Sequence, residues 1–381
     1  MTVTGEPDEV VDGDQLVVIL LVLSSMDLRF NNLQYTVNAT NVDMDVAGLL
    51  FAASDGTVNG FTWIAGQAQW GNMTVTTTEA GDAATFSVRL SSIPTNVVVV
   101  HILSLRTHDI TVTPSNLTFN QLDWQVPQQV SVTGQHDWIC HGNQAVDVLL
   151  TSASKDPYYT NFARKVNVII MDIDVAGLNI FDSHGTVGGV TGATLQVTTT
   201  EAGIKDAFSI SLSSIPTHTV ILNIVSSRAS EVSVQPSSLT FEPGDWNTKR
   251  EVTVAGHHDS MVDGDQIVSV LLSTFSSDPA YHGLEYHLNV TNVDVDIAGL
   301  TVSPNAVTTT EEGASSTIFV HLNTRPTTTV YVDVTSEDAS EVTAAPKTLI
   351  FNATAWNQSK AVVVTGHNDF VADGNKIVRV S

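Results

Sequence analysis

Apolar and polar residues alternate along most of the chain in short runs, the pattern of strands that bury one face. The alternation is clearest between residues 195 and 294, where turn residues such as Pro243 and Gly244 separate the runs. It predicts seven strands there, at residues 195–200, 207–213, 219–226, 231–234, 250–255, 267–274 and 286–294. Since no helical periodicity interrupts them, the sequence predicts an all-β fold of the sandwich type.

The longest apolar run, residues 16–23 (LVVILLVL), is far shorter than the ~20 residues of a membrane helix. It aligns with residues 267–272, which lie in a predicted strand. We therefore interpret it as a buried strand and expect no membrane insertion in this segment.

Three short motifs recur in the same order and indicate tandem repeats. TTTEAG or TTTEEG ends at Gly81, Gly203 and Gly313, VTG or VAG at Gly134, Gly256 and Gly366, and D-x-D-[VI]-A-G at Gly48, Gly177 and Gly299. These motifs predict the C-terminal part of a repeat at 1–47, full repeats at 48–176 and 177–298, and the N-terminal part of a repeat at 299–381. No linker separates them, so we expect closely abutted domains.

Both ends of the chain fall inside a repeat, which predicts a fragment of a longer array. In the alternative arrangement, residues 25–47 supply the strand missing after Ser381 of a neighbouring molecule and build an open filament. Residues 3–21 duplicate residues 363–381, which disfavours that arrangement.

The net charge of the chain limits the kinds of molecule that it can bind. Lys and Arg number 15 against 40 Asp and Glu, a net charge of −25. Such a surface repels phosphates and anionic lipids, so we expect no nucleic-acid partner and regard cations as natural ligands. Cys140 is the single cysteine, so no internal disulfide holds the domains together.

An ordered set of segments characterises the second full repeat: LTFEPGDW (239–246), VTV (252–254), HD (258–259) and VDGDQ (262–266). The same order recurs at 117–124 with 134–144, and at 349–356 with 366–376. This arrangement resembles the Calx-beta family, whose seven-stranded sandwiches occur in sodium–calcium exchangers and in tandem on cell-surface and matrix proteins. The resemblance implies tandem immunoglobulin-like (Calx-beta-like) sandwiches that bind Ca²⁺.

Acidic residues recur at three places in each repeat: after TTT, in the loop after VTG or VAG, and in the closing D-x-D. Ca²⁺ requires six to eight oxygen ligands, and these three places can meet at one pole of a sandwich. The candidate ligands are Glu201, Asp259, Asp263, Asp265, Asp294, Asp296, Glu311, Asp369, Asp373, Glu79, Asp137, Asp172, Asp174, Asp43 and Asp45. Any one of these acids alone is more often a turn former or a solvated group, so their joint recurrence carries the prediction.

The site of repeat 48–176 departs from this pattern. His141 and Asn143 stand where the next repeat has Asp263 and Asp265, so we expect a weak or empty calcium site there. The histidines have no partners at a recurring zinc spacing, and we interpret these as solvated loop residues: His136, His141, His257, His258 and His367.

The sequence gives less support for ligand stacking or for catalysis. Trp124, Trp246 and Trp356 recur after the LTF segment, and we interpret them as buried anchors in preference to a ligand-stacking platform. Cys140 has no recurring catalytic partner and no phosphate-binding loop is present, so we predict no enzyme activity.

Glycine-rich insertions precede the TTTE motif at residues 54–71 and 183–193. They are interpreted as decorated loops or, because Phe61, Trp63 and Trp70 look exposed, as a contact surface. N-glycosylation motifs, which carry glycans in a secreted eukaryotic protein, stand at Asn38, Asn72, Asn116, Asn289, Asn352 and Asn357.

These features predict a structural or adhesive array on the cell surface or in a secreted fibre, coat or appendage. Calcium would stiffen it into a rod or filament, because the metal-free carboxylates repel one another. The expected partners are copies of itself or other surface and matrix proteins, with glycans a further candidate. The alternatives are a calcium-sensing regulatory module and a carbohydrate-binding surface protein.

Overall fold

The computed structural model describes residues 1–54, 58–59, 61–64, 67–189, 195–371 and 374–381, with the backbone alone for the residues between 58 and 68. Strands are the regular elements of these ranges and no helix occurs among them, which confirms the predicted all-β fold. None of the described residues forms a helix that could cross a membrane. The chain forms two compact units, Met1–Val175 and Ala176–Ser381.

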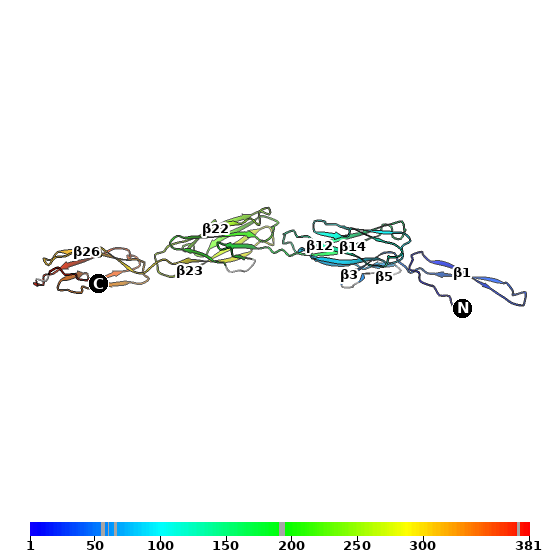
Figure 1. Ribbon diagram of the computed structural model, residues 1–381, viewed down its shortest axis with the longest axis horizontal. Helices are drawn as coiled ribbons and strands as arrows, with labels where there is room; N and C mark the ends of the chain where they lie inside the picture. Colours follow the sequence, from blue (N-terminus) through cyan, green and yellow to red (C-terminus); the bar gives the residue numbers. More distant parts are fainter. Residues whose placement is uncertain (55–57, 60, 65–66, 190–194, 372–373) are drawn as a thin grey trace. The chain divides into compact units, whose positions relative to one another are not determined.

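The first unit contains a sandwich of two five-stranded sheets (Figure 1). Their strand orders are β10-β12-β8-β3-β4 and β11-β9-β13-β14-β7. The strands are β3 (Leu49–Ala53), β4 (Val58–Asn59), β7 (Met73–Thr78), β8 (Ala83–Leu90), β9 (Val98–Ser104), β10 (Ile110–Thr113), β11 (Asn116–Phe119), β12 (Gln128–Gly134), β13 (Gln144–Ser154) and β14 (Ala163–Met171). A separate ribbon, β5 (Phe61–Ile64) with β6 (Gln67–Trp70), lies in the insertion between β4 and β7.

The second unit repeats this sandwich, with strand orders β16-β15-β18-β22-β20 and β17-β24-β23-β19-β21. The strands are β15 (Leu178–Asp182), β16 (Val187–Gly189), β17 (Val197–Thr200), β18 (Lys205–Leu212), β19 (Val220–Ser226), β20 (Val232–Gln235), β21 (Ser238–Phe241), β22 (Arg250–Gly256), β23 (Gln266–Ser276) and β24 (Glu285–Val293).

Two smaller sheets complete the second unit, with strand orders β25-β26-β30-β28 and β27-β29. Their strands are β25 (Leu300–Ser303), β26 (Ser315–Leu322), β27 (Val330–Asp333), β28 (Val342–Ala345), β29 (Thr348–Phe351) and β30 (Lys360–Gly366). They bury a smaller core around Phe351, which is fully buried.

Strict alternation of apolar residues explains why these segments are strands. In β9, Val98, Val100 and Ile102 are buried, while His101 between them is exposed. The alternating residues of both sheets form one core in each full sandwich. Phe86 lies in the first of these cores, its ring edge-on to that of Phe51 with the centroids 6.1 Å apart. Cys140 is a free thiol, so these cores hold together without a disulfide.

All seven strands predicted between residues 195 and 294 are present, as β17, β18, β19, β20, β22, β23 and β24. The sandwich also contains β15, β16 and β21, of which β21 pairs with β19. β15 is present because the first strand is divided between the two sheets. β15 pairs with β18 in one sheet, whereas β17 pairs in parallel with β24 in the other.

The insertion at 183–193 lies between β15 and β17, the two parts of the divided first strand. Its strand β16 forms a hairpin with β15. A side chain at Gly189 would place its Cβ 1.9 Å from the Leu178 carbonyl oxygen, and the φ of Gly189 is +79°. Only glycine fits this position. Residues 190–194 of the insertion lie outside the described residues.

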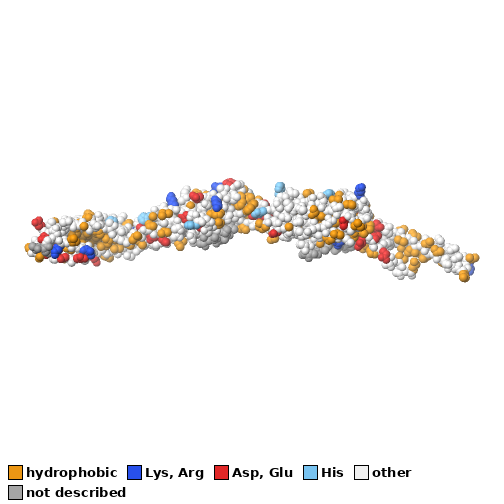
Figure 2. All heavy atoms as spheres, in the orientation of Figure 1, with side chains coloured by type: hydrophobic (Ala, Val, Ile, Leu, Met, Phe, Trp, Pro, Cys, Tyr) orange, Lys and Arg blue, Asp and Glu red, His pale blue; other side chains and the backbone are white. Residues whose placement is uncertain are grey.

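Strands β1 (Gln15–Val22) and β2 (Gln34–Asn41) form a hairpin that pairs with itself alone among the described residues. The expectation that the apolar run at 16–23 is buried is wrong: Leu16 is 63% exposed and Leu20 52%. Figure 2 shows hydrophobic side chains spread over this hairpin. The physical reason is that no second sheet covers either face of it within the described residues.

The recurrent tryptophans are core residues, which confirms the buried-anchor interpretation. Trp124 belongs to the first core, and Trp246 and Trp356 pack against the second and third cores. The carbonyl oxygen of each accepts a hydrogen bond from a leucine N–H of the neighbouring strand, at 2.8–2.9 Å.

A buried tyrosine closes each full sandwich. The Tyr159 hydroxyl accepts a hydrogen bond from the Ser92 N–H at 3.1 Å and donates to the Ser92 carbonyl at 2.9 Å. Tyr281 makes the same two bonds with Ser214.

We expect Tyr159→Phe to lower the free energy of unfolding by about 1–2 kcal/mol, because it leaves the buried Ser92 groups without their partner. Urea denaturation of the full chain measures this loss. The neighbouring variant Tyr158→Phe is the control, since the Tyr158 side chain is 48% exposed. Equal effects of the two variants would contradict a structural role for the buried hydroxyl.

Candidate metal centre

The acidic residues of each full repeat meet at one end of the sandwich because of strand pairing. β17 and β24 run in parallel, with Thr200 opposite Val293, so both strands end at the same edge. Glu201 and Asp294 are the next residues of the two strands, and the Glu201 N–H donates to the Val293 carbonyl at 3.1 Å. Glu79 and Met171 repeat this bond in the first sandwich, at 3.2 Å.

The glycine of the VTG or VAG motif brings the third acidic segment to this edge. The Gly256 N–H donates to the Thr199 hydroxyl at 2.8 Å, and a Cβ on Gly256 would lie 2.8 Å from the Thr200 carbonyl oxygen. Gly134 has the same relation to Thr77 and Thr78. The loop that begins at His257 therefore starts beside Glu201, which explains why the two motifs recur together.

The first aspartate of the D-x-D motif fixes the acidic loop. One oxygen of Asp294 accepts hydrogen bonds from the N–H groups of Asp263 and Gly264, at 3.1 and 2.8 Å. The other oxygen accepts from the Asp296 N–H at 2.8 Å. These backbone donors lower the pKa of Asp294. Asp294 is thus an internal acceptor that holds the loop.

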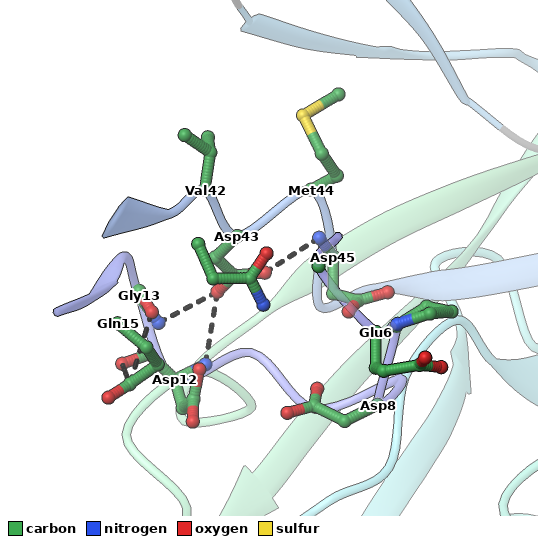
Figure 3. Close-up of a pocket in the computed structure, with 12 residues that line it drawn as sticks. Glu6, Asp8, Asp12, Gly13, Gln15, Val42, Asp43, Met44 and Asp45 are labelled. Atoms are coloured by element: carbon green, nitrogen blue, oxygen red, sulfur yellow. Dashed lines mark hydrogen bonds between the residues drawn. The ribbon is translucent and has the colours of Figure 1, made fainter. Parts of the chain in front are cut away.

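Asp172 and Asp43 make the equivalent bonds. Asp172 accepts from the N–H groups of His141, Gly142 and Asp174. Figure 3 shows Asp43 within hydrogen-bonding distance of the backbone of Asp12, Gly13 and Asp45.

A reciprocal bond completes this loop. The Asp294 N–H donates to Asp265 Oδ1 at 3.1 Å, and the Asp172 N–H donates to Asn143 Oδ1 at the same distance. The amide oxygen of Asn143 thus accepts the same backbone hydrogen bond as the carboxylate oxygen of Asp265. Asn143 therefore preserves the loop and gives no structural reason for an impaired site in residues 48–176.

The second sandwich gathers buried carboxylates that lack partners. Glu201 is 5% exposed, and its Oε2 and the Oδ2 of Asp296 are buried without a hydrogen-bond partner. His258 Nδ1 lies 3.4 Å from Asp296 Oδ2 and 3.8 Å from Glu201 Oε2. Burial, with the charges of Asp259, Asp294 and Asp296, raises the pKa of Glu201 to about 7. Such an excess of buried negative charge fits a bound cation.

The first sandwich has the same geometry with an additional imidazole. Glu79 is 4% exposed, and its Oε2 and the Oδ2 of Asp174 are buried without a hydrogen-bond partner. His136 Nε2 lies 3.0 Å from Asp174 Oδ1, and His141 Nε2 lies 2.9 Å from Asp137 Oδ2.

The charges in this cluster change the pKa of one acid, Glu79, and of one imidazole, His141. Burial and the charges of Asp137 and Asp172 raise the pKa of Glu79. Burial alone would lower the pKa of His141, but the hydrogen bond to Asp137 and the nearby carboxylates raise it. His136, His141 and His258 are exposed loop residues, and the strand ends also bring their rings against the carboxylates.

Among the described residues, the acidic segments of 1–47 and 299–381 form no such buried cluster. Glu311 is exposed, Asp369 accepts a hydrogen bond from the Val371 N–H, and Asp373 lies outside the described residues. Asp45 has a raised pKa from burial and from the charges of Asp43 and Asp8. Within the described ranges, groups of His, Asp and Glu with metal-ligand spacing form in the two full sandwiches.

Trp70 is half-buried, so the expectation of an exposed aromatic surface is wrong for this residue. Its ring packs on Phe162, with centroids 5.6 Å apart, and on the Arg164 guanidinium at 5.0 Å. The side chains of Phe61 and Trp63 lie outside the described residues. The carbohydrate-binding alternative thereby loses Trp70 as a stacking platform.

The predicted glycosylation motifs are accessible. All six asparagines, Asn38, Asn72, Asn116, Asn289, Asn352 and Asn357, are exposed. Glycan attachment stays a prediction.

No protein-family model and no curated protein matches the sequence. The chain is similar to the crystal structure of CBD12 from CALX1.2 at 13% identity and a TM-score of 0.26, over 55% of this chain and 83% of that one. For PcdhgB3 EC1-4 the values are 9% and 0.30, over 93% of this chain and 74% of that one. For the human desmocollin-1 ectodomain they are 7% and 0.27, over 97% and 64%. TM-scores this low carry no functional assignment, so function rests on the chain's own residues.

Proposed function

We propose that the chain is part of an extracellular structural or adhesive array of Calx-beta-like sandwiches that calcium stabilises. Its repeats would be residues 1–47, 48–176, 177–298 and 299–381. The observation that carries the proposal is the pair of buried oxygens of Glu201 and Asp296 that have no hydrogen-bond partner. Asp259 and Asp263 supply further oxygens at the same loop, so carboxylate oxygens, the ligands that Ca²⁺ prefers, outnumber the single imidazole of His258.

Calcium would act next to the contacts between successive repeats. In the first unit the Ile93 N–H donates to the carbonyl of Glu9 at 2.7 Å, and Glu9 belongs to the acidic loop before β1. In the second unit the Arg325 N–H donates to the carbonyl of Ser260, which has the same loop position as Glu9. An ion that orders this loop would also order the contact, which supports a stiffening role.

We expect Ca²⁺ to raise the melting temperature of the chelator-treated full chain and to increase its hydrodynamic length. An ion at 100 times its Kd stabilises the folded state by about 2.7 kcal/mol. Glu201→Gln and Asp296→Asn should each remove most of this gain, because each deletes a buried charged ligand. Calorimetric titration and small-angle scattering with and without calcium measure both quantities.

Glu251→Gln is the matched control, since it removes the same charge from an exposed position early in β22. It should leave the calcium response intact. An unchanged melting temperature and length in millimolar calcium, against a chelator control, would rule out the calcium-stabilised array.

A further inference from the structure

The repeat at residues 48–176 places two imidazoles in its acidic cluster. By the alignment of motifs, His136 stands where the next repeat has His258, and His141 where it has Asp263. The corresponding residues of the incomplete first repeat are Pro7 and Asp12. This site therefore has two imidazoles, His136 and His141, where the site of the second sandwich has one, His258.

These imidazoles share one buried, unsatisfied carboxylate. Glu79 forms one group with His136 and Asp174 and another with Asp137 and His141, and in each the ligand atoms lie within 4.8 Å of one another. The side chain of Asp174 is 7% exposed, and an oxygen of it also has no partner. The His136 ring is further held by Trp138, with ring centroids 4.2 Å apart.

We propose that residues 48–176 hold a divalent transition-metal ion of the zinc type in two adjoining ligand groups that share Glu79: His136 with Asp174, and His141 with Asp137. Ligands of a tetrahedral zinc at about 2.1 Å lie about 3.4 Å from one another. The nitrogen-to-oxygen separations of 3.0 and 2.9 Å at His136 and His141 are close to this spacing. The ion would take the place of the hydrogen bonds now made between each imidazole and its carboxylate.

The donor set selects against calcium. Ca²⁺ is coordinated by oxygen, whereas imidazole together with carboxylate suits zinc and its neighbours in the transition series. His141 replaces a potential oxygen ligand and adds a nitrogen ligand in a single substitution. Two sandwiches with the same loop geometry thereby differ in the class of metal they accept.

The experiment titrates the chelator-treated full chain with Zn²⁺ by calorimetry and with Co²⁺ by visible absorption, which reports the geometry around the ion. We expect one strong site, with a loss of affinity of about tenfold or more in His141→Asp and in His136→Asn. Cys140→Ser and His108→Asn are controls for binding through the thiol or through an exposed histidine of the same sandwich. Both should bind zinc as the unaltered chain does.

The variant Asp263→His tests the proposal by gain of function, because it copies the histidine pair into the second sandwich. We expect a second zinc site, and a loss of calcium binding there. Melting in chelator shows whether each variant is folded. No zinc binding by the unaltered chain, or equal zinc affinity in His141→Asp and His108→Asn, would overturn the proposal. Neither result would alter the calcium response tested with Glu201→Gln.

Discussion

Replacing Asp172 with alanine is expected to lower the free energy of unfolding of the first sandwich by about 3 kcal/mol. The carboxylate accepts from three backbone N–H groups, those of His141, Gly142 and Asp174, at 2.6–2.8 Å. Without it the loop after β12 loses the two hydrogen bonds through which His141 and Gly142 are fixed to the end of β14. Urea denaturation of the full chain in the presence of chelator measures the effect apart from any metal.

Two variants delimit this prediction. Asp172→Asn keeps one acceptor oxygen, so its free energy of unfolding should lie between those of the alanine variant and the unaltered chain. Asp147→Ala removes an exposed ion pair with Lys165 and should cost less than about 1 kcal/mol. If Asp172→Ala is no more harmful than Asp147→Ala, the carboxylate does not hold the loop.

Gly256→Ala is expected to destabilise the second sandwich by about 2–3 kcal/mol and to weaken its calcium response. The added Cβ would lie 2.1 Å from Asn292 Oδ1 and 2.8 Å from the Thr200 carbonyl oxygen. The asparagine side chain can move, but the carbonyl belongs to β17 and carries Glu201 with it. Thermal melting with and without calcium separates the two effects.

Gly244→Ala is the matched control in the same sandwich. An added Cβ there meets no atom within 4 Å, and the position has no left-handed backbone. This substitution should be neutral or slightly stabilising, because alanine restricts the unfolded chain. Equal losses in the two variants would show that close packing at Gly256 is unimportant.

The sequence predicted the fold well where alternation was strong. The seven strands between residues 195 and 294 follow from apolar periodicity that depends on one-sided burial. β15 was not predicted, because LNIFD is short and is followed by a glycine-rich segment that resembles a loop. Burial of residues 16–23 was predicted wrongly, because apolar character shows which residues favour a core and not whether a partner sheet covers them.

The sequence predicted which acidic residues form the candidate site, but it did not predict the role of each residue. Recurrence drew attention to Asp294 and Glu201 alike, yet Asp294 accepts backbone hydrogen bonds while one buried oxygen of Glu201 accepts none. This difference depends on which atoms face inward, which spacing does not report. His141 was interpreted as a solvated loop residue without carboxylate neighbours for a related reason, since two of these neighbours, Glu79 and Asp172, follow the ends of β7 and β14.

The parallel pairing of first and last strands has a mechanical consequence. β7 and β14 align from Met73 with Val166 to Thr78 with Met171, and β17 and β24 align from Val197 with Val290 to Thr200 with Val293. Tension applied through the two ends of a full sandwich pulls these neighbouring strands in opposite directions. All the hydrogen bonds between the two parallel strands then bear the force at the same time. In an antiparallel hairpin such as β1–β2, the hydrogen bonds would break one after another.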